Sequence, residues 1–419
     1  MAQLKDDCFA FGDALIPYED AMADLAKRLA PVVETETVPL VKAAGRVLAE
    51  DIVSDRNVPP HDNSAVDGYA VFFSDLAADA ETRLPLTGRV AAGHPLGRDA
   101  RPGEAVRIFT GAPMPAGMDT VFMEEDCTPS GDDVILPAGL KQGANRRFAG
   151  EDVKSGDVIV RAGMQLRPQD VGLAASVGRN ALTVYAPLRV AVFSTGDEVR
   201  DPSDDAPEGC IYDANRFAVM AMLERLGVVV TDLGILPDNE TAIADALGQA
   251  AGGQHVLMTS GGVSAGEEDH VKAAVEKLGS IHFWRLAIKP GRPIALGQAG
   301  DAAFIGLPGN PVAAMVTFLM IAQPMLRQLA GETGYRAARL RVPTDFEYKK
   351  KRGRREWVRV ALDSGADGAP VARKHHSSGA GILTSMAGAD GLVEVGEDVE
   401  RLEAGASVTY IPFSGLLSG

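Results

Sequence analysis

The stretch LRVAVFSTGDEV, residues 188–199, decides the fold. It begins as a mainly apolar run, which is typical of a strand buried on both faces of a sheet, and it ends in a polar loop that contains glycine. A helix predicted over residues 216–227, a strand over 228–236, a helix over 239–252 and a strand over 255–262 follow in turn. Strands that alternate with helices of this length predict a doubly wound α/β domain with a parallel sheet.

The same alternation continues to residue 331. A helix is predicted over residues 269–279, a strand over 302–309 and a long closing helix over 311–331. We therefore expect the α/β domain to span residues 188–331.

The segments on either side have a different pattern. Residues 61–150 consist of short β-prone runs between Gly and Pro turns, which predicts a small all-β domain. Residues 332–419 again contain short strand-like runs, whose spacing suits a small β-barrel or sandwich. Near the N-terminus, apolar residues at helical spacing predict a helix over residues 17–30, and Arg167-Pro168 marks the start of another.

Composition limits the class of protein. The 419 residues include 41 Lys and Arg against 57 Asp and Glu, so the net charge is −16, and nucleic-acid binding is not expected. Three cysteines lie far apart, which favours a reducing compartment. No secretory signal is visible, and the longest apolar stretch, residues 312–322, is shorter than the roughly 20 residues that a membrane span needs. We expect a soluble cytoplasmic protein without membrane contact.

Four loops of the α/β block follow predicted strands, at the sheet edge where ligands of such folds bind. The loop TSGGVSAGEED, residues 259–269, predicts an anion site, because the N–H groups of Gly261 and Gly262 and the hydroxyls of neighbouring serines can cradle a phosphate. The sequence LPGNP at residues 307–311 repeats this logic ahead of a helix. A pair of plain tight turns is an equally good interpretation from the residues alone.

Carboxylates gather at the same edge and would repel a phosphate. A bridging Mg²⁺ would resolve the conflict, because it binds carboxylate and phosphate oxygens together. The alternative is that each acid caps or begins a helix, and Asp238 fits that alternative best. Cations also follow in the chain, where a solvated face is the alternative to a ligand contact. The acids are Asp197, Glu198, Asp238, Glu267, Glu268 and Asp269, and the cations are Arg285, Lys289 and Arg292.

Two polar segments lie outside the α/β block. The turn at residues 62–68 holds two Asp, an Asn and a Ser, more polar groups than a turn requires. The run KKKRGRR, residues 349–355, has six cations in seven residues, but the acidity of the chain and the lack of aromatics within the run argue against a nucleic-acid patch. A hairpin between two strands is the favoured interpretation, and capture of an anion for a neighbouring pocket is the alternative.

Eight segments in a fixed order resemble the molybdopterin molybdenumtransferase family, whose members insert molybdate into molybdopterin and which includes the C-terminal part of gephyrin. The resemblance covers residues 18–419, nearly the whole chain. The segments are DNSAVDGYAV, RIFTGAPMPAG, RRFAGEDV, VAVFSTGDEV, IYDANRFAV, SGGVSAGEED, FWRLAIKPGRP and GLPGNPVA.

The resemblance implies four domains and a homodimer. The active site would lie between the second domain of one subunit and the third and fourth domains of the other. Adenylated molybdopterin and molybdate would be the substrates, AMP would be released, and Mg²⁺ would assist. Contact with a molybdopterin adenylyltransferase is a further expectation. The domains would be a linking domain of residues 18–57 and 150–187, a β domain of 58–149, an α/β molybdopterin-binding domain of 188–331 and a C-terminal β-barrel of 332–419.

The resemblance also assigns roles to residues of this chain. Asp238 and Asp269 would hold the cation, and Gly261, Gly262 and Ser264 would bind the pterin-side phosphate. Positive side chains would offset oxyanion charge. The implied catalytic residues are Asp67, Thr110, Asp152, Glu198, Asp238 and Asp269, and the implied binding residues are Ser260, Gly261, Gly262, Ser264, Arg285, Lys289, Pro308, Gly309, Asn310 and Pro311.

Several departures and two alternatives accompany this assignment. Val66 stands where many members have Met, His270 stands where many have Tyr, and the basic run at residues 349–355 is denser than expected. Ala380 stands where the family usually has a Ser, which leaves Ser378 as the candidate substitute. A nucleotide pyrophosphatase could share the central domain, but the segments around Asp67 and Thr110 argue against it. A non-catalytic scaffold of the gephyrin kind is the other alternative, and the intact acidic positions argue against that one.

Overall fold

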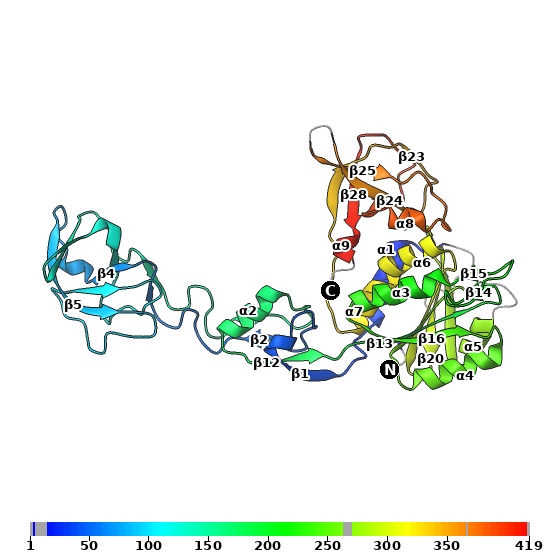
Figure 1. Cartoon of the computed structure of the whole chain (residues 1–419), viewed down its shortest axis with the longest axis horizontal. Coiled ribbons are helices and arrows are strands. Elements are labelled where there is room, and N and C mark those ends of the chain that lie inside the picture. Colours follow the sequence, from blue (N-terminus) through cyan, green and yellow to red (C-terminus); the bar gives the residue numbers. More distant parts are fainter. Residues whose placement is uncertain (1–2, 5–14, 263–269, 366–367, 417–419) are drawn as a thin grey trace.

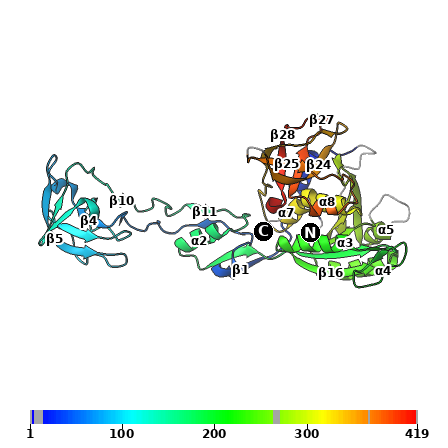
Figure 2. The same cartoon turned by 45° about the horizontal axis from the view of Figure 1, so that its top comes forward.

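The computed structural model describes residues 3–4, 15–262, 270–365 and 368–416. The molecule is long, with a small β body at one end, a larger α/β and β body at the other, and a thin middle part between them (Figures 1 and 2). The predicted α/β centre with β structure on either side in sequence is confirmed. The predicted domain boundaries stay a prediction.

A six-stranded sheet forms the centre of the larger body. Its strand order is β16-β13-β17-β21-β20-β18, and the first four strands are parallel. These four are the predicted strands, so the predicted parallel sheet is confirmed for them. The last two strands were not predicted: β20 is antiparallel to β21, and β18 is antiparallel to β20, which makes the whole sheet mixed. Apolar runs show that a strand is buried but not its direction. The strands are β13 Arg189–Thr195, β16 Val229–Leu236, β17 Val256–Ser260, β18 Gly279–Arg285, β20 Pro293–Ala299 and β21 Ala302–Leu307.

Helices cover both faces of this sheet because alternate strand residues point to opposite sides. Val192 of β13 packs in a buried cluster with Leu223 and Phe318, whereas the adjacent Phe193 packs with Leu247 and residues of the opposite helices. The helices of the first face are α1 Tyr18–Arg28, α3 Ala214–Arg225, α6 Pro311–Thr317 and α7 Gln323–Leu329, and those of the second are α4 Glu240–Ala251 and α5 His270–Leu278.

The closing helix contains a π-helical turn, Phe318–Ala322, between α6 and α7. The combined stretch Pro311–Leu329 is long and apolar enough to cross a membrane by length and composition alone, but 83% of its most apolar window is buried inside the protein. Burial of this kind is typical of the core helix of a soluble protein. The two-residue strands β14 Val199–Arg200 and β15 Ile211–Tyr212 enclose the loop of residues 201–210, which precedes α3 in the chain.

The C-terminal strands form a small barrel beside the central sheet. They pair in the order β19-β24-β26-β28-β22, and β25 pairs with the other part of β24. An isolated bridge between Thr344 and Ala372 joins the end of β22 to β25 and closes the ring. The elements are β19 Ile288–Lys289, β22 Leu340–Pro343, β23 Tyr348–Lys349, β24 Arg355–Ser364, β25 Pro370–Lys374, β26 Gly391–Val395, β27 Arg401–Leu402, β28 Ser407–Pro412, α8 Thr384–Ala387 and α9 Phe413–Leu416.

The small body at the far end is a second six-stranded sheet. Its order is β7-β4-β6-β5-β9-β8, and both faces carry buried clusters, one around Tyr69 and Phe122 and the other around Ile108 and Val121. The strands are β4 Gly68–Val71, β5 Thr82–Val90, β6 Ala105–Ile108, β7 Thr120–Met123, β8 Thr128–Ser130 and β9 Asp133–Leu136, with the pair β3 Asn63–Ser64 and β10 Arg146–Arg147 beside them.

The middle part draws on two separate stretches of chain. β1 pairs with β12 and β2 pairs with β11, and one cluster of buried residues joins Val38 and Ile52 from the first stretch to Val153 and Val184 from the second. Because neither stretch can bury its apolar side chains alone, the two must fold together. The elements are β1 Thr35–Pro39, β2 Ile52–Val53, β11 Val158–Val160, β12 Ala181–Tyr185 and α2 Pro168–Ser176.

Candidate functional site

A cleft of about 600 Å³ lies between the central sheet and the C-terminal barrel. Its central wall consists of the loop ends after β17 and β21 and the segment that follows β19. These positions are carboxyl ends of parallel strands, the place where folds of this class bind ligands. The central wall comprises Glu198, Gly261, Gly262, residues 289–293, Pro308, Gly309, Asn310 and Ala313, and the barrel wall comprises Tyr348, Trp357, Val358, Arg359, Lys374, Ser377, Ser378 and Ala380.

The two predicted glycine loops meet in this cleft. Gly261 and Gly262 have φ angles of +87° and +62°, which side-chain-bearing residues rarely adopt. A Cβ on Gly309 would lie 3.5 Å from the Cα of Gly261, so the two backbones are in contact. Ser260 is buried, and its hydroxyl donates to the carbonyl of Pro308 at 3.3 Å, so it joins the loops and does not line the cleft. Bare backbone therefore forms one end of the cleft.

Arg359 gives the barrel wall its main charge. This arginine is only 6% exposed, and its guanidinium donates to the hydroxyl of Ser385 at 3.0 Å and to the carbonyls of Ser377 and Gly379. Burial lowers its pKa, yet a guanidinium stays protonated at neutral pH. No carboxylate of the described residues pairs with it. A buried cation without a carboxylate, beside a cleft, suits an anionic ligand.

Lys289 stands opposite on the central wall. Its ammonium lies 3.5 Å from a carboxylate oxygen of Glu356, which is almost fully buried and also accepts hydrogen bonds from Tyr348 and Arg354, each at 2.6 Å. Burial alone would raise the pKa of Glu356, but the hydrogen bonds from Tyr348 and Arg354 and the charge of Lys289 lower it below its usual value. Glu356 is thus ionised and holds Lys289 at the edge of the cleft.

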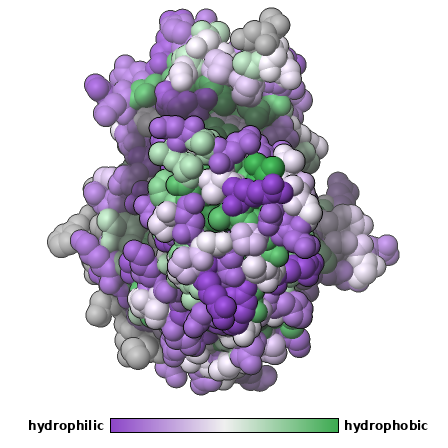
Figure 3. Space-filling view, turned by 90° about the vertical axis from the view of Figure 1, so that its left-hand side faces the viewer, coloured by the Kyte–Doolittle hydropathy of each residue, from purple (hydrophilic) through white to green (hydrophobic). Residues whose placement is uncertain are grey.

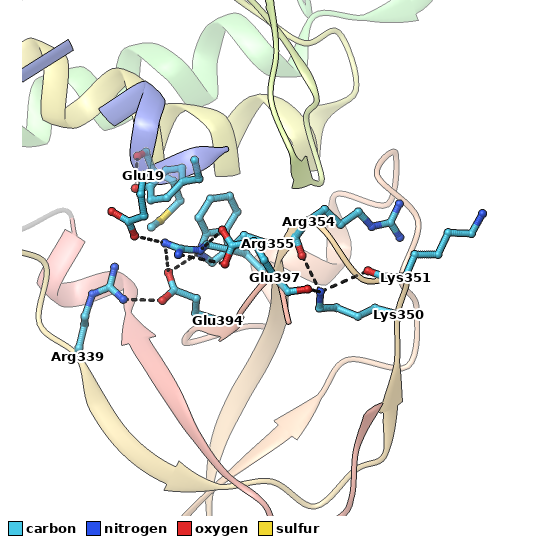
Figure 4. A network of polar contacts seen from close by, with 11 residues as sticks. Glu19, Arg339, Lys350, Lys351, Arg354, Arg355, Glu394 and Glu397 are labelled. Carbon is cyan, nitrogen blue, oxygen red and sulfur yellow. Dashed lines mark hydrogen bonds and ion pairs between the residues drawn. The ribbon is translucent and has the colours of Figure 1, made fainter. Parts of the chain in front are cut away.

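Three of the six cations in the basic run at residues 349–355 make hydrogen bonds or ion pairs within the protein, namely Lys350, Arg354 and Arg355. Lys350 donates to backbone carbonyls of Lys351, Arg354 and Glu397, and Arg355 pairs with acids around it (Figure 4). Arg354 binds Glu356. The run does connect two strands, since β23 ends at Lys349 and β24 begins at Arg355, but β23 pairs with β27 whereas β24 pairs with β19, β25 and β26. The favoured interpretation, a hairpin between these strands, is therefore wrong, and the run is a loop between two sheets.

Asp67 and Thr110 lie together, but far from the cleft of their own chain. A carboxylate oxygen of Asp67 accepts from the backbone N–H and the hydroxyl of Thr110, both at 2.7 Å. These two hydrogen bonds, in that order, lower the pKa of Asp67. The sheet that carries them is at the opposite end of the molecule (Figure 1). Asp152 is exposed where the chain returns to the middle part, and its N–H donates to Val58.

The remaining predicted residues are not all brought together. Asp238 is exposed and accepts from the Thr195 hydroxyl at 2.9 Å; neither it nor Arg285, at the end of β18, is among the lining residues of the cleft. Pro311 begins α6, next to lining residues. Ser264, Glu267, Glu268 and Asp269 lie outside the described residues. Within the described residues, no group of three or more His, Cys, Asp or Glu side chains is placed to hold a metal ion.

Sequence reasoning missed Arg359, Lys374 and Trp357 as site residues. Trp357 and Arg359 are two apart on β24, so both can line the cleft from one strand, and the alternating segment REWVRV contains that signal. Lys374 ends β25, which lies beside β24. An arginine inside an otherwise apolar strand pattern is the feature that could have marked this wall. Ser378 and Ala380 both line the cleft, as the substitution of one for the other requires.

Comparisons with known proteins cover nearly the whole chain. Family models match residues 16–178 (MoeA N-terminal region, domain I and II), 191–328 (probable molybdopterin binding domain) and 341–413 (MoeA C-terminal region, domain IV). A molybdopterin molybdenumtransferase of Haemophilus influenzae is 38% identical over 96% of this chain and all of its own length. One from Nostoc sp. is 33% identical over 89% of this chain and 88% of its own. A crystal structure of a molybdopterin biosynthesis MoeA protein from Pyrococcus horikoshii matches with a TM-score of 0.83 and 29% identity, over 95% of this chain and all of that one.

Proposed function

Because the chain belongs to the molybdopterin molybdenumtransferase family, we propose that it inserts molybdate into adenylated molybdopterin and releases AMP. The observation that carries the proposal is the buried Arg359, which faces a cleft and has no carboxylate partner among the described residues. Molybdate and the substrate phosphates are anions that such a group can bind. This places the protein among the transferases of molybdenum cofactor biosynthesis, and we propose that it acts in the cytoplasm.

The two walls of the cleft would bind different parts of the substrates. Arg359, Lys289 and Lys374 supply positive charge near the hydroxyl of Ser378, an arrangement suited to the tetrahedral molybdate oxyanion. The backbone of the two glycine loops would accept the phosphate of the pterin side, because bare N–H groups bind phosphate oxygens. During the reaction water would attack a phosphorus of the phosphoanhydride bond and AMP would leave with its phosphate. The two dithiolene sulfurs would replace two oxygens of molybdate, which would leave as water after protonation. Fixed positive groups would stabilise the charge that develops on the separating oxygens.

We further propose a Mg²⁺ ion at the carboxylate edge. The exposed carboxylate of Asp238 pairs with no cation of the described residues, and Asp269, which lies outside them, is the second acid that the resemblance assigns to the cation. Carboxylate oxygens are the ligands Mg²⁺ prefers, with substrate phosphates and water completing its shell. Bound there, the ion would neutralise phosphate charge. Arg285 and Glu198 would act at the same edge as the resemblance implies.

We propose that the working unit is a homodimer. Asp67 and Thr110 form an ordered, exposed pair, yet they lie at the opposite end of the molecule from the cleft of their own chain. Seen from that end, the surface is mostly hydrophilic with small apolar patches among polar residues (Figure 3). A second copy would bring this pair, with Asp152, to the cleft. A molybdopterin adenylyltransferase would deliver the adenylated substrate directly.

Molybdate-dependent AMP release tests this function. Wild-type protein with adenylated molybdopterin should release AMP faster when molybdate is added, and Arg359→Met should lose about 100-fold or more in kcat/KM. The matched control is Arg373→Met, an exposed arginine one strand away that pairs with Asp345 and Asp363. AMP release that ignores molybdate would favour the pyrophosphatase alternative. A wild type that releases no AMP under these conditions would favour the scaffold.

A further inference from the structure

The N-terminal helix α1 contacts both the central domain and the C-terminal barrel, whose walls form the cleft. Tyr18, at its first turn, is 7% exposed. Its hydroxyl donates to the carbonyl of Met320 in the π-helical turn of the central domain, at 3.0 Å. Its ring meets Trp357 of the barrel edge-on, with ring centroids 5.1 Å apart. One side chain thus contacts both the central domain and the barrel, and Trp357 itself lines the cleft.

A charged cluster strengthens the same junction. The guanidinium of Arg355 lies over the ring of Tyr18, 4.8 Å from its centroid, and pairs with Glu19 of α1 at 2.5 Å (Figure 4). It also pairs with Glu397 at 3.2 Å and lies 3.8 Å from Glu394. The Arg355 side chain is only 11% exposed, and so is that of Glu394, so solvent screens this part of the cluster less than at an open surface; the Glu19 side chain is 70% exposed and its pair with Arg355 is screened more.

The chain just before α1 pairs with the segment between β18 and β19, which leads into the central wall of the cleft. The N–H of Ile16 donates to the carbonyl of Arg285 at 2.8 Å, and the N–H of Ala287 donates to the carbonyl of Ile16 at 2.7 Å. On its other side, the carbonyl of Ala287 accepts from the N–H of Arg355. The segment that leads into Lys289 is therefore held between the N-terminal segment and β24.

Strand β24, which begins with Arg355, also carries residues of the cleft farther along. β19 pairs with the start of β24, with Lys289 opposite Glu356, and Arg359 follows farther along β24. A shift of Arg355 would move both the partner of Lys289 and the strand that carries Arg359. Contacts of this kind fix the distance between groups on opposite walls, on which ligand binding depends steeply.

We propose that Tyr18 and Glu19 are positioning residues of the cleft: they hold the barrel against the central domain so that Arg359 and Lys289 face the same oxyanion. The identity of that oxyanion as molybdate rests on the proposed function. The two residues touch no substrate and act through Arg355 and Trp357. Because they set the position of binding groups, they affect how tightly molybdate is held more than how fast the bound complex reacts.

Kinetics of four full-length variants test the proposal. Tyr18→Leu should raise the KM for molybdate about tenfold while kcat stays within about twofold of wild type, and Tyr18→Phe and Glu19→Gln should give smaller rises in the same direction. Asp20→Asn is the matched control, because Asp20 is the next residue of the helix, is exposed, and loses the same charge. A fall in kcat with unchanged KM, or equal effects of Glu19→Gln and Asp20→Asn, would overturn the proposal.

Hydrogen exchange without substrate separates this inference from the function. Amides of β19 and the first half of β24 should exchange about tenfold faster in Tyr18→Leu than in wild type, and amides of β5 and β6 in the distant sheet should not change. Unchanged exchange at β19 and β24 would overturn the positioning role even if the enzyme releases AMP. If Tyr18→Leu shows faster exchange in β19 and β24 but the wild-type protein shows no molybdate-dependent AMP release, the result would support the role of α1 and reject the proposed function.

Discussion

Two buried arginines of this chain differ in what surrounds them. Arg216, 2% exposed, is bound by Asp201 at 2.5 Å, Asp213 at 2.9 Å and Asp232. Arg359 has neutral partners only among the described residues. Taking a charge out of water is costly unless other groups compensate it. The charge of the first arginine is compensated inside the protein, whereas the second, within the described part of the chain, makes hydrogen bonds to neutral groups only, and we propose that an anionic ligand compensates its charge.

Removing Arg216 should destabilise the protein strongly. Arg216→Met would leave Asp213, itself buried, without its partner, and loss of one member of a buried ion pair costs about 3–5 kcal/mol. We expect the thermal unfolding midpoint of the larger body to fall by several degrees, measured by calorimetry. Arg225→Met, at the exposed end of the same helix, should change it little. Equal midpoints for the two variants would contradict the structural role of Arg216.

Glu104 should make the stability of the distant sheet depend on pH. A hydrogen bond from Arg98, opposed by burial and helped by Thr87 and the N–H of Arg101, lowers its pKa from 4.5 to about 2. Its stabilisation is therefore complete above about pH 4.5 and is lost as the pH falls towards 2.

Glu104→Gln should lower the free energy of unfolding by about 1–3 kcal/mol at pH 7, measured from urea unfolding of the full chain. The difference from wild type should shrink steadily between pH 4.5 and pH 2. Glu81→Gln serves as the control, because Glu81 is an exposed acid that immediately precedes β5 of the same sheet. A difference between wild type and Glu104→Gln that is independent of pH would show that the carboxylate charge is not its cause.

At the scale of elements, the turn after β19 is held closely by the closing helix. Gly291 has a φ of +85°, and a Cβ at this position would lie 2.2 Å from the hydroxyl oxygen of Thr317 in α6. Gly291→Ala should therefore displace the turn that lines the cleft, cost about 1–3 kcal/mol of stability and reduce kcat/KM for AMP release.

Gly172→Ala gives the matched comparison for that variant. Gly172 lies inside α2, with nothing within 4 Å of its added Cβ, and alanine favours helices, so stability should rise by up to about 1 kcal/mol with unchanged activity. Both quantities come from urea unfolding and steady-state kinetics. A Gly291→Ala protein as stable and active as Gly172→Ala would show that the turn is free to move.

The sequence predicted some elements better than others for physical reasons. Long amphipathic and apolar segments such as α1 and β13 follow from side-chain periodicity, which the chain itself carries. The reversed direction of β20, and the place of β18 beside it at the sheet edge, depend on which neighbours these strands find, and no local pattern encodes that. The glycine loops were predicted to share one edge, and they do meet in the cleft. Arg359 was missed because its meaning depends on the absence of a carboxylate, which only the fold reveals.

At the scale of the whole molecule, the long shape separates two groups of candidate site residues. The central sheet and barrel, whose residues line the cleft, lie at one end, and the sheet of β4 and β6, next to which Asp67 and Thr110 stand in sequence, lies at the other (Figure 2). A dimer in which each small sheet reaches the cleft of the other copy would reunite them, in keeping with the symmetry of most homo-oligomers.

Complementation between variants tests that arrangement. Asp67→Asn and Arg359→Met should each be nearly inactive alone, whereas their co-expressed mixture should recover about one quarter of wild-type AMP release, because half of randomly paired dimers are mixed and each has one intact site of two. Differently tagged copies allow the mixed dimer to be purified and assayed. No recovery in the purified mixed dimer would mean that both residues serve one site within a single chain.

The small sheet is an insertion whose two ends meet. The chain enters it after Val58 and leaves it before Val153, and these two residues form a β-bridge with each other. Neighbouring entry and exit points are how a fold accepts an extra domain without disturbing its host. Removing residues 59–152 and joining Val58 to Val153 through a short turn would keep the pairing of β2 with β11 and would remove no residue that lines the cleft. The molecule can thus be described as a complete host fold with one inserted domain, the small sheet, joined to it by two stretches of chain. In the proposed dimer this inserted domain would act on the cleft of the other copy.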